Sequence, residues 1–338
     1  MTNIAVIGCG NWGPNHVRNF AGLPGSRVDV IVDLDPARLE AVRQYHPGVR
    51  CEQDHWAALD DPAVDAVVVA TPMHTHYQLV RDALVAGKHV LCEKPLCETA
   101  KEGAELVELA RAQGLRLIVG HVFLFNPGVE RLRELVQGGD LGRLYYLAGF
   151  RTNLGPIRSD ANAAYDLAAH DIAIFNWLLG AEPETVSATG AAFLQPDIED
   201  VVFVSLRYPG GVLAGVQASW LDPKKVRQIT VVGSKRMATW DDLRLTAPVA
   251  VFDKGASAVQ DYGDFGEFLR LSTWEGDVRL PKVSSEEPLK AQARHFLEAV
   301  TGGRVRRSDG PFAVGVVRTL EAVAASIRAG GSTMEVNP

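Results

Sequence analysis

A carboxylate and an imidazole lie four residues apart in the stretch Tyr165-Asp166-Leu167-Ala168-Ala169-His170-Asp171. If this stretch starts a helix, Asp166 and His170 face the same way, one turn from each other. Such a pair could remove the proton of an alcohol hydroxyl, since hydride cannot leave an alcohol carbon until the O–H proton is taken. A base of this kind contributes roughly 10²–10⁴ in rate. The same spacing also fits a helix-start acid followed by a core histidine, and both interpretations stay open.

A second group with chemical potential is Glu93-Lys94-Pro95, which follows the strand-like run His89–Cys92. The following proline restricts the backbone of Lys94, so the lysine would point into a crevice from a fixed position. Partial burial and a neighbouring cation would both lower the pKa of its ammonium, making it a better proton donor or relay. The alternative is a Glu–Lys surface pair ahead of a helix.

A glycine-spaced turn near the N-terminus is suited to holding a diphosphate. The apolar run Ile4–Ile7 leads into Gly8-Cys9-Gly10-Asn11-Trp12-Gly13, and a helix-like segment, Asn15–Leu23, follows. In this order the first glycine allows a sharp turn, the second lets the backbone approach a pyrophosphate, and the third lets helix and strand pack closely. The N–H groups at the helix start would face the phosphates. The predicted cofactor contacts here are Gly8, Gly10, Asn11, Trp12 and Gly13.

An acid at the end of the next strand-like run indicates which cofactor the turn would hold. The run Val28–Val32 ends at Asp33, about twenty residues after the glycines, where a Rossmann fold places an acid on the adenosine ribose. A carboxylate there accepts hydrogen bonds from the ribose hydroxyls and repels a 2′-phosphate, which favours NAD over NADP. Arg38 would soften that preference. The alternative is a glycine turn and a solvated acid without a ligand.

The segment Thr71–His76 follows the apolar run Ala66–Ala70. Because ligands bind beyond the carboxyl ends of the strands of an open parallel sheet, this turn is expected along the ribose and nicotinamide side of the cofactor. The predicted contacts are Thr71, Pro72, His74, His76 and, from the neighbouring strand, Glu93 and Lys94. Capping of a helix start is the alternative for the two histidines. We predict no metal site, because no third ligand accompanies them at a suitable spacing.

Length and composition limit the class of protein. The 338 residues suffice for two domains of about 150 residues each. A hydrophobic share of 47% and a charged share of 22% fit a soluble globular protein. A net charge of −7 argues against a general nucleic-acid or membrane-surface binder.

Targeting features and cysteine spacing indicate the compartment. No apolar run approaches the roughly 18–20 residues that span a bilayer, and no cationic region precedes the first apolar run, so we expect no signal peptide. The four cysteines, Cys9, Cys51, Cys92 and Cys97, show no Cys-x-x-Cys spacing. We therefore expect reduced thiols in a cytoplasmic protein.

The first third of the chain alternates strand-like and helix-like segments. The strand-like runs are Ile4–Ile7, Val28–Val32, Val49–Cys51, Ala66–Ala70, His89–Cys92 and Arg116–Val119. Repeated βα units of this length predict an α/β domain, a Rossmann doubly wound parallel sheet with helices on both faces. We expect this domain to comprise residues 1–121 and to bind NAD.

After Gly120 the pattern changes. Strand-like runs without intervening helices follow a helix at Ala164–Leu179; they are Thr185–Phe193, Val201–Tyr208, Val212–Ser219, Gln228–Val232 and Arg236–Trp240. Pro209-Gly210-Gly211 is a strong hairpin signal. This predicts an α+β domain over residues 122–338 with a largely antiparallel sheet. Residues 252–285 show little periodicity and are expected to be loop or edge decoration, before two closing helices at Leu289–Val300 and Ala313–Ala329.

Together these motifs resemble the Gfo/Idh/MocA oxidoreductase family, the group of glucose–fructose oxidoreductase and inositol dehydrogenase. The resemblance covers nearly the whole chain and rests on Gly8–Gly13, Asp33, Thr71-Pro72, Glu93-Lys94-Pro95, Gly120-His121, Asn126-Pro127 and Asp166–His170. The conjunction of Glu-Lys-Pro with Asp-x-x-x-His is specific, whereas each alone is not. It implies that Lys94 is the catalytic lysine, Asp166 orients the substrate and His170 is the acid/base.

One departure from the family pattern is Ala168, where many relatives carry glycine in Asp-x-Gly-x-His. The change is small and puts only the local turn in doubt. The resemblance also implies an open-faced sheet in the second domain that often forms oligomer contacts, and we expect a homodimer or homotetramer.

Within the family, Gly10–Asn15, Gly120–Phe123 and Leu221–Asp242 look most like the nucleotide-sugar branch, which includes the 3-dehydrogenases of UDP-N-acetylglucosaminuronate. Besides Lys94, Asp166 and His170, the expected substrate contacts are Arg151, Asn153 and Tyr165. Arg151 could meet a carboxylate or phosphate, although a strand-end arginine is more often solvated.

The expected function is hydride transfer between a secondary alcohol of a sugar or nucleotide-sugar, at C3, and NAD. Three alternatives stay open: an NADPH-dependent 3-ketosugar reductase, an inositol or free-sugar dehydrogenase, and a non-enzymatic NAD-binding regulator. Asp33 argues against the first, and the intact set of Lys94, Asp166 and His170 argues against the last.

Overall fold

The computed structural model describes residues 1–263, 266–305 and 307–336, with the side chains of 257–271 left aside. The chain divides into two compact units. Unit 1 comprises Met1–Phe125 and Glu286–Glu321, and unit 2 comprises Asn126–Ser285 and Ala322–Pro338. Each unit therefore combines two segments that are distant in the sequence.

Unit 1 contains a parallel sheet, as the alternating pattern predicts. Among the described residues its six strands lie in the order β3-β2-β1-β4-β5-β6, and all five pairs are parallel. The strands are β1 (Thr2–Ile7), β2 (Ser26–Val32), β3 (Arg50–Glu52), β4 (Ala66–Val69), β5 (His89–Cys92) and β6 (Leu117–Val119). This is the Rossmann order. The chain adds strands to one side of β1 first and then, from β4, to the other side, and such folds bind ligands at this switch point between β1 and β4. The predicted fold class is confirmed.

Unit 1 also contains helices, and side chains cap the starts of two of them. They include α1 (Gly13–Ala21), α2 (Pro36–Arg43), α3 (Trp56–Leu59), α4 (His76–Val85), α5 (Ala100–Ala112) and α8 (Pro288–Val300). The carboxylate of Asp35 accepts from the N–H of Ala37 at the start of α2. Thr99 and Glu102 form a reciprocal capping box at the start of α5. These two caps fix where α2 and α5 begin.

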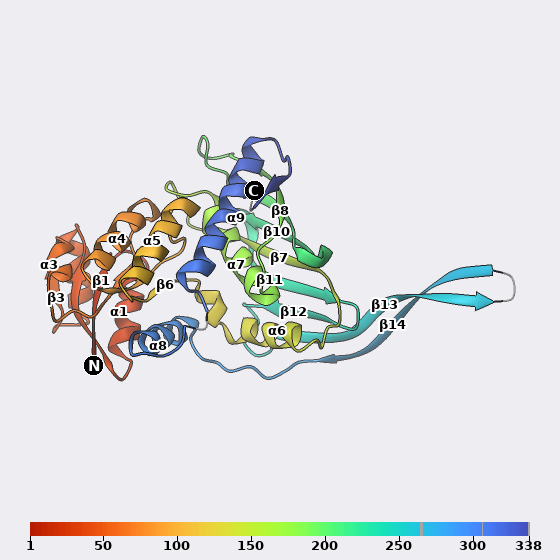
Figure 1. The fold of residues 1–338 in the computed structure, drawn as a ribbon, viewed down its shortest axis with the longest axis horizontal. Helices are drawn as coiled ribbons and strands as arrows, with labels where there is room; N and C mark the ends of the chain where they lie inside the picture. Colours follow the sequence, from red (N-terminus) through yellow and green to blue (C-terminus); the bar gives the residue numbers. More distant parts are fainter. Residues whose placement is uncertain (264–265, 306, 337–338) are drawn as a thin grey trace. The chain divides into compact units, whose positions relative to one another are not determined.

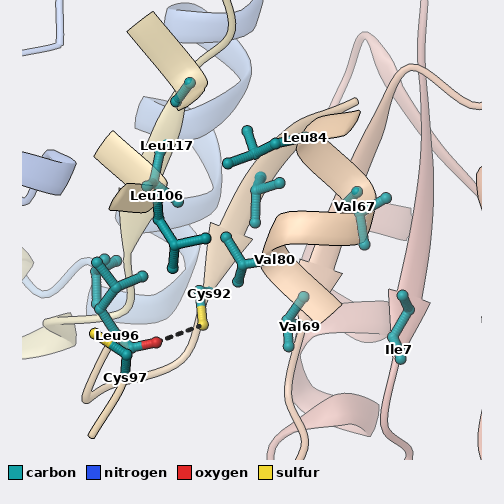
Figure 2. Packing of buried hydrophobic residues seen from close by; sticks show 14 of the residues in the cluster. Ile7, Val67, Val69, Val80, Leu84, Cys92, Leu96, Cys97, Leu106 and Leu117 are labelled. Carbon is teal, nitrogen blue, oxygen red and sulfur yellow. Dashed lines mark hydrogen bonds between the residues drawn. The ribbon is translucent and has the colours of Figure 1, made fainter. Parts of the chain in front are cut away.

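Apolar residues cover both faces of this sheet. Alternate residues of β1 enter two different hydrophobic clusters, Ala5 and Ile7 one of them and Ile4 and Val6 the other. Figure 2 shows the first cluster, where side chains of β1, β4 and β5 meet those of α4 and α5. Its labelled members are Ile7, Val67, Val69, Val80, Leu84, Cys92, Leu96, Cys97, Leu106 and Leu117. Complete burial of each valine or leucine contributes about 1.5–3 kcal/mol.

Unit 2 is built on a mostly antiparallel sheet. Its nine described strands lie in the order β14-β13-β12-β11-β7-β10-β9-β8-β15, and β10 pairs in parallel with β7. They are β7 (Leu144–Leu154), β8 (Thr185–Ala191), β9 (Val201–Arg207), β10 (Leu213–Ser219), β11 (Leu221–Gly233), β12 (Met237–Asp241), β13 (Val249–Gly263), β14 (Gly266–Arg279) and β15 (Met334–Glu335). The hairpin predicted at Pro209-Gly210-Gly211 is confirmed, because it joins the antiparallel strands β9 and β10.

The expectation of loop or edge decoration over residues 252–285 is confirmed as to the edge, because β14 ends the strand order, but a loop is wrong for most of that segment. Strands β13 and β14 pair antiparallel from Val251 with Arg279 to Gly263 with Gly266. Figure 1 shows them running together as a long ribbon away from the other strands of their sheet. The described residues of β14 from Ser272 onward are almost all exposed. Since this part of the strand buries no apolar face, its sequence carries no alternating pattern to detect.

Helices cover one face of the sheet of unit 2 and leave the other open. They include α6 (Pro127–Gln137), a π-helical turn η3 (Ala164–Ala168) that continues as α7 (Ala169–Leu179), and the end of α9 (Gly310–Arg328). Along β7, Leu147 and Gly149 are buried, and the space beside Gly149 is filled by Asp171 and Phe175 of α7. On the opposite face, Tyr146 and Phe150 are exposed.

Helix α9 is long and apolar enough to cross a membrane by length and composition, with a mean hydropathy of 1.3. However, 61% of its most apolar 18-residue stretch is buried. Its residues Ala313, Val314 and Val317 belong to the hydrophobic cluster shown in Figure 2. The helix therefore belongs to the hydrophobic core.

Candidate active site

The glycine turn has the geometry that a close-approaching diphosphate requires. Gly8 has a φ of +97°, and a Cβ there would lie 2.5 Å from the carbonyl oxygen of Ala70. A Cβ on Gly13 would lie 2.0 Å from the oxygen of Gly8, so α1 can pack this closely only with glycine. At Gly10 the nearest atom to an added Cβ is a guanidinium nitrogen of Arg38 at 3.9 Å, which leaves open space above the turn. The residues present thus fit a bound dinucleotide.

Asp33 ties this turn to the end of β2. One carboxylate oxygen accepts from the backbone N–H of Cys9 at 2.7 Å, and the other accepts from that of Asp35 at 2.9 Å. The guanidinium of Arg38 is 3.9 Å from the carboxylate and 57% exposed. Asp33 therefore shapes the loop as well as standing where an adenosine ribose is expected. Burial, with the Asp33 carboxylate adding to it, raises the pKa of the Cys9 thiol to about 12.

The Thr71–His76 turn is held by its own side chains. The hydroxyl of Thr75 contacts the hydroxyl of Thr71 and the carbonyl of Pro72, both at 2.7 Å. The buried ring of His76 lies between two backbone carbonyls, Pro95 at 2.8 Å and Thr71 at 2.9 Å. Burial lowers the pKa of His76, so a neutral ring donates to one of these carbonyls. Its contacts are those of a residue that joins the two loops, while His74 is exposed.

Glu93 and Lys94 follow β5 at the same edge of the sheet. Glu93 is buried, and one carboxylate oxygen lies 2.7 Å from Nε2 of His16 on α1. The other oxygen accepts from the backbone N–H of Lys94 at 3.3 Å. Lys94 itself is half-buried. The ring of His121 is buried nearby, and burial followed by the charge of Lys94 lowers the pKa of His121 to about 3.

In unit 2, Asp166 is fixed by two donors that the sequence pattern did not reveal. The indole N–H of the buried Trp220 donates to one oxygen at 3.1 Å, and Arg158 donates to the other at 3.4 Å. The guanidinium of Arg158 also donates to the carboxylate of Asp160. Asp166 lies within the π-helical turn Ala164–Ala168, and His170 is the second residue of α7. The turn that carries Ala168 is therefore wider than α-helical, a feature that recurs at functional sites.

The side chain of Arg151 is buried, whereas an arginine at an exposed strand end would be solvated. Its guanidinium is 2% exposed and makes two contacts, of 2.6 and 3.2 Å, with the fully buried carboxylate of Asp171. This pair joins β7 to the first turn of α7, directly after His170. Its contacts are those of a group that positions the helix, and a direct substrate contact by Arg151 stays a prediction. Asn153 and Tyr165 are half-buried in the same unit.

The structure thus gathers the predicted residues in two sets. The glycine turn, Asp33, Thr71, Glu93 and Lys94 lie at the carboxyl ends of strands in unit 1, and Asp166 and His170 share one helical segment of unit 2. Sequence reasoning missed His16, Trp220 and Arg158, because their contacts join residues whose spacing follows no local pattern. In the described ranges, no group of three or more His, Cys, Asp or Glu residues could hold a metal ion.

A parallel sheet of this order with an open glycine turn defines the class of dinucleotide-binding proteins. Residues 2–121 match the family model described as an oxidoreductase family with an NAD-binding Rossmann fold, and residues 129–239 match the GFO/IDH/MocA C-terminal domain. The chain belongs to the Gfo/Idh/MocA oxidoreductase family, as the motifs predict, and it is an NAD-binding oxidoreductase.

Individual relatives agree with this assignment. The chain is 35% identical over 222 residues to Inositol 2-dehydrogenase 2 of Saccharopolyspora erythraea, covering 64% of this chain and 66% of the relative. It is similar to GenD2 from gentamicin A biosynthesis, solved with NAD, with a TM-score of 0.84, 26% identity and coverage of 100% and 97%. For UDP-N-acetylglucosamine 3-dehydrogenase GnnA of Acidithiobacillus ferrooxidans the TM-score is 0.81, with 27% identity and 97% coverage of both chains. The chain spans about two thirds of the length of several curated relatives.

Proposed function

We propose that this protein is an NAD-dependent dehydrogenase that transfers hydride between a secondary alcohol of a sugar or nucleotide-sugar, at C3 of the ring, and NAD. The observation that carries the proposal is the carboxylate of Asp166, fixed by Trp220 and Arg158 four residues before His170. Unit 1 adds Lys94, at a strand end of an NAD-binding sheet. These are the groups that oxidation of an alcohol needs.

In this mechanism the bound NAD supplies the hydride acceptor, and the side chains of the chain handle the alcohol. His170 takes the O–H proton, the electrons of the O–H bond form the C=O bond, and the hydrogen of the C–H bond would leave with its electron pair for NAD. Asp166 orients the ring by accepting from a substrate hydroxyl, since its oxygens are aimed by two fixed donors. Lys94 donates a hydrogen bond to the reacting oxygen and relays the proton. The reverse reaction returns the proton from the same groups.

The Lys94→Ala variant tests this assignment. It should lose more than roughly 10² in kcat, given what acid/base groups contribute, while its affinity for NAD stays close to that of the unchanged protein. Steady-state turnover and NADH binding by fluorescence measure the two quantities. Lys101→Ala, which removes an exposed lysine of α5, is the matched control. Retained turnover in Lys94→Ala refutes the role of this lysine.

Two substrate classes are supported by relatives. The name of GnnA points to C3 of a nucleotide-sugar, whereas Inositol 2-dehydrogenase 2 acts on a cyclitol by its name. We propose the nucleotide-sugar first, because Gly10–Asn15, Gly120–Phe123 and Leu221–Asp242 resemble that branch and the structural likeness to GnnA covers nearly the whole chain. Formation of NADH with UDP-sugars, free sugars and inositols side by side separates the classes. Turnover of inositols alone would transfer the proposal to the second class.

Asp33 bears on the choice between NAD and NADP. Asp33 would repel the 2′-phosphate of NADP, which disfavours an NADPH-dependent 3-ketosugar reductase. Titration with both dinucleotides tests this preference, and tighter binding of NADPH would favour the reductase. We also propose that residues 1–121 form the NAD-binding domain, and residues 122–338 the substrate-binding and oligomerisation domain.

The open face of the sheet in unit 2 supports a homodimer or homotetramer. Four large apolar side chains on this face are exposed, on the neighbouring strands β7, β10 and β9: Tyr146, Phe150, Leu213 and Phe203. A flat apolar face of this kind is suited to packing against a second copy of itself. Light scattering of the intact protein and of Phe150→Glu tests the oligomer, which the charge should weaken.

A further inference from the structure

The contact between His16 and Glu93 joins the dinucleotide-binding helix to the turn that carries Lys94. Nε2 of His16 lies 2.7 Å from a carboxylate oxygen of Glu93, and the two residues are 77 positions apart in the chain. His16 is fully buried in the first turn of α1, where its backbone N–H donates to the carbonyl of Trp12 in the glycine turn. A buried carboxylate needs such a partner, because an unpaired charge away from water is costly.

The carboxylate of Glu93 has little freedom to move. A Cβ on Gly120 would lie 3.0 to 3.1 Å from both of its oxygens and its carboxyl carbon, so the side chain occupies the space that glycine leaves. The backbone N–H of Gly120 in turn donates to the carbonyl of Cys92 at 2.7 Å, which fixes that segment beside β5. The second oxygen of Glu93 accepts from the backbone N–H of Lys94. One carboxylate therefore contacts both α1 and the backbone of the lysine.

The ring of His16 is also fixed. It stacks on Phe20, with ring centroids 6.4 Å apart, and Phe20 packs edge-on against Phe296 of α8. In the described part of the chain, Nδ1 of His16 has no hydrogen-bond partner, so the contact through Nε2 is the polar contact that orients this ring. Since the carboxylate accepts, Nε2 carries the donated proton.

We propose that His16 is a positioning residue that acts through Glu93 to hold the backbone of Lys94 in register with the dinucleotide-binding helix. A pyrophosphate bound at the start of α1 would fix that helix. Because the His16–Glu93 contact joins α1 to the turn at Lys94, the position of the helix then determines the position of this turn. The inference rests on the proposed function in that Lys94 serves the proton transfer. It assigns His16 a role in placing the lysine, separate from contact with substrate or cofactor.

Three variants separate this role from simple packing. His16→Leu removes the donor, His16→Gln keeps an amide N–H at a similar reach, and Gly120→Ala crowds the carboxylate without changing either partner. His55→Leu is the matched control, because His55 makes a comparable contact of 3.2 Å with Asp82 elsewhere in unit 1. Three quantities are measured for each: the thermal midpoint, the Kd for NADH and kcat. The rate of reductive methylation of Lys94, read by mass spectrometry, is compared with and without NADH.

We expect His16→Leu and Gly120→Ala to lower kcat by about 10–100-fold, as loss of partners that orient reactive groups does. The change in Lys94 methylation that NADH produces should be lost in both, and His16→Gln should restore both quantities to within about threefold. His55→Leu should alter only the thermal midpoint. Equal NADH dependence of methylation in His16→Leu and the unchanged protein would overturn the proposal. Should no sugar be oxidised at all, the proposed function fails, yet the methylation result still decides the role of His16.

Discussion

Replacement of Arg151 by methionine should strongly destabilise unit 2. The guanidinium is 2% exposed and the partner carboxylate of Asp171 is completely buried, with contacts of 2.6 and 3.2 Å. Removal of one partner leaves the other charge buried without its counterion, which costs about 3–5 kcal/mol. The contact lies where β7 meets α7, directly after His170, so turnover should fall together with stability.

The double variant Arg151→Met with Asp171→Leu separates the charge from the shape. Removing both charges should recover most of the lost stability, because an apolar pair of similar volume often replaces a buried ion pair without loss. Arg207→Met, at an exposed position of β9, is the control and should change stability by no more than about 0.5 kcal/mol.

Urea unfolding followed by tryptophan fluorescence is a suitable assay. Four of the six tryptophans, Trp177, Trp220, Trp240 and Trp274, belong to unit 2. The single variant should lower the urea midpoint at an unchanged slope, and the double variant should restore it. A cost below about 1 kcal/mol for Arg151→Met, or an equal cost for the double variant, would contradict the argument that burial of an unpaired charge dominates.

Three further changes test other parts of the molecule. Gly13→Ala should abolish NADH binding in a fluorescence titration, because the added Cβ would lie 2.0 Å from the carbonyl oxygen of Gly8. Trp220→Phe should lower kcat/KM by about tenfold or more, since a hydrogen bond to the charged Asp166 contributes about 1.5–3 kcal/mol. The pKa of His121 is lowered from 6.5 to about 3 by burial, so its contribution to stability is complete above pH 6.5 and is lost progressively as the pH falls from 6.5 to 3. His121→Phe should reduce the loss of urea midpoint between pH 7 and pH 4, and an unchanged loss would assign acid sensitivity to other groups.

Local patterns in the sequence predicted unit 1 because its elements are specified locally. The spacing of Gly8, Gly10 and Gly13 encodes a turn whose steric demands the structure reproduces, and apolar runs mark the buried parallel strands. Asp33 was predictable in position but not in its second role. Its hydrogen bond to the N–H of Cys9 depends on how two strands pair, which spacing along one strand does not reveal.

The contacts that fix the candidate site could not be read from the sequence for the same reason. His16 meets Glu93 across 77 positions, and Trp220 meets Asp166 across 54. Sequence patterns rest on periods of two or 3.6 residues and carry no information on such pairs. Arg151 was expected at a strand end that could face a ligand, yet the strand β7 continues to Leu154 and buries the arginine against Asp171. The extra length of the strand determined its environment.

The charges around Asp166 bear on what kind of substrate the site accepts. Arg158 contacts two carboxylates, those of Asp160 and Asp166, and Arg151 is paired with Asp171. In these described contacts each guanidinium already faces a carboxylate, so neither offers a strong site for a phosphate or a uronate. A fixed carboxylate instead accepts hydrogen bonds from hydroxyl groups. This supports a neutral polyol ring beside Asp166 and His170, and any charged part of a larger substrate would have to be bound by other residues.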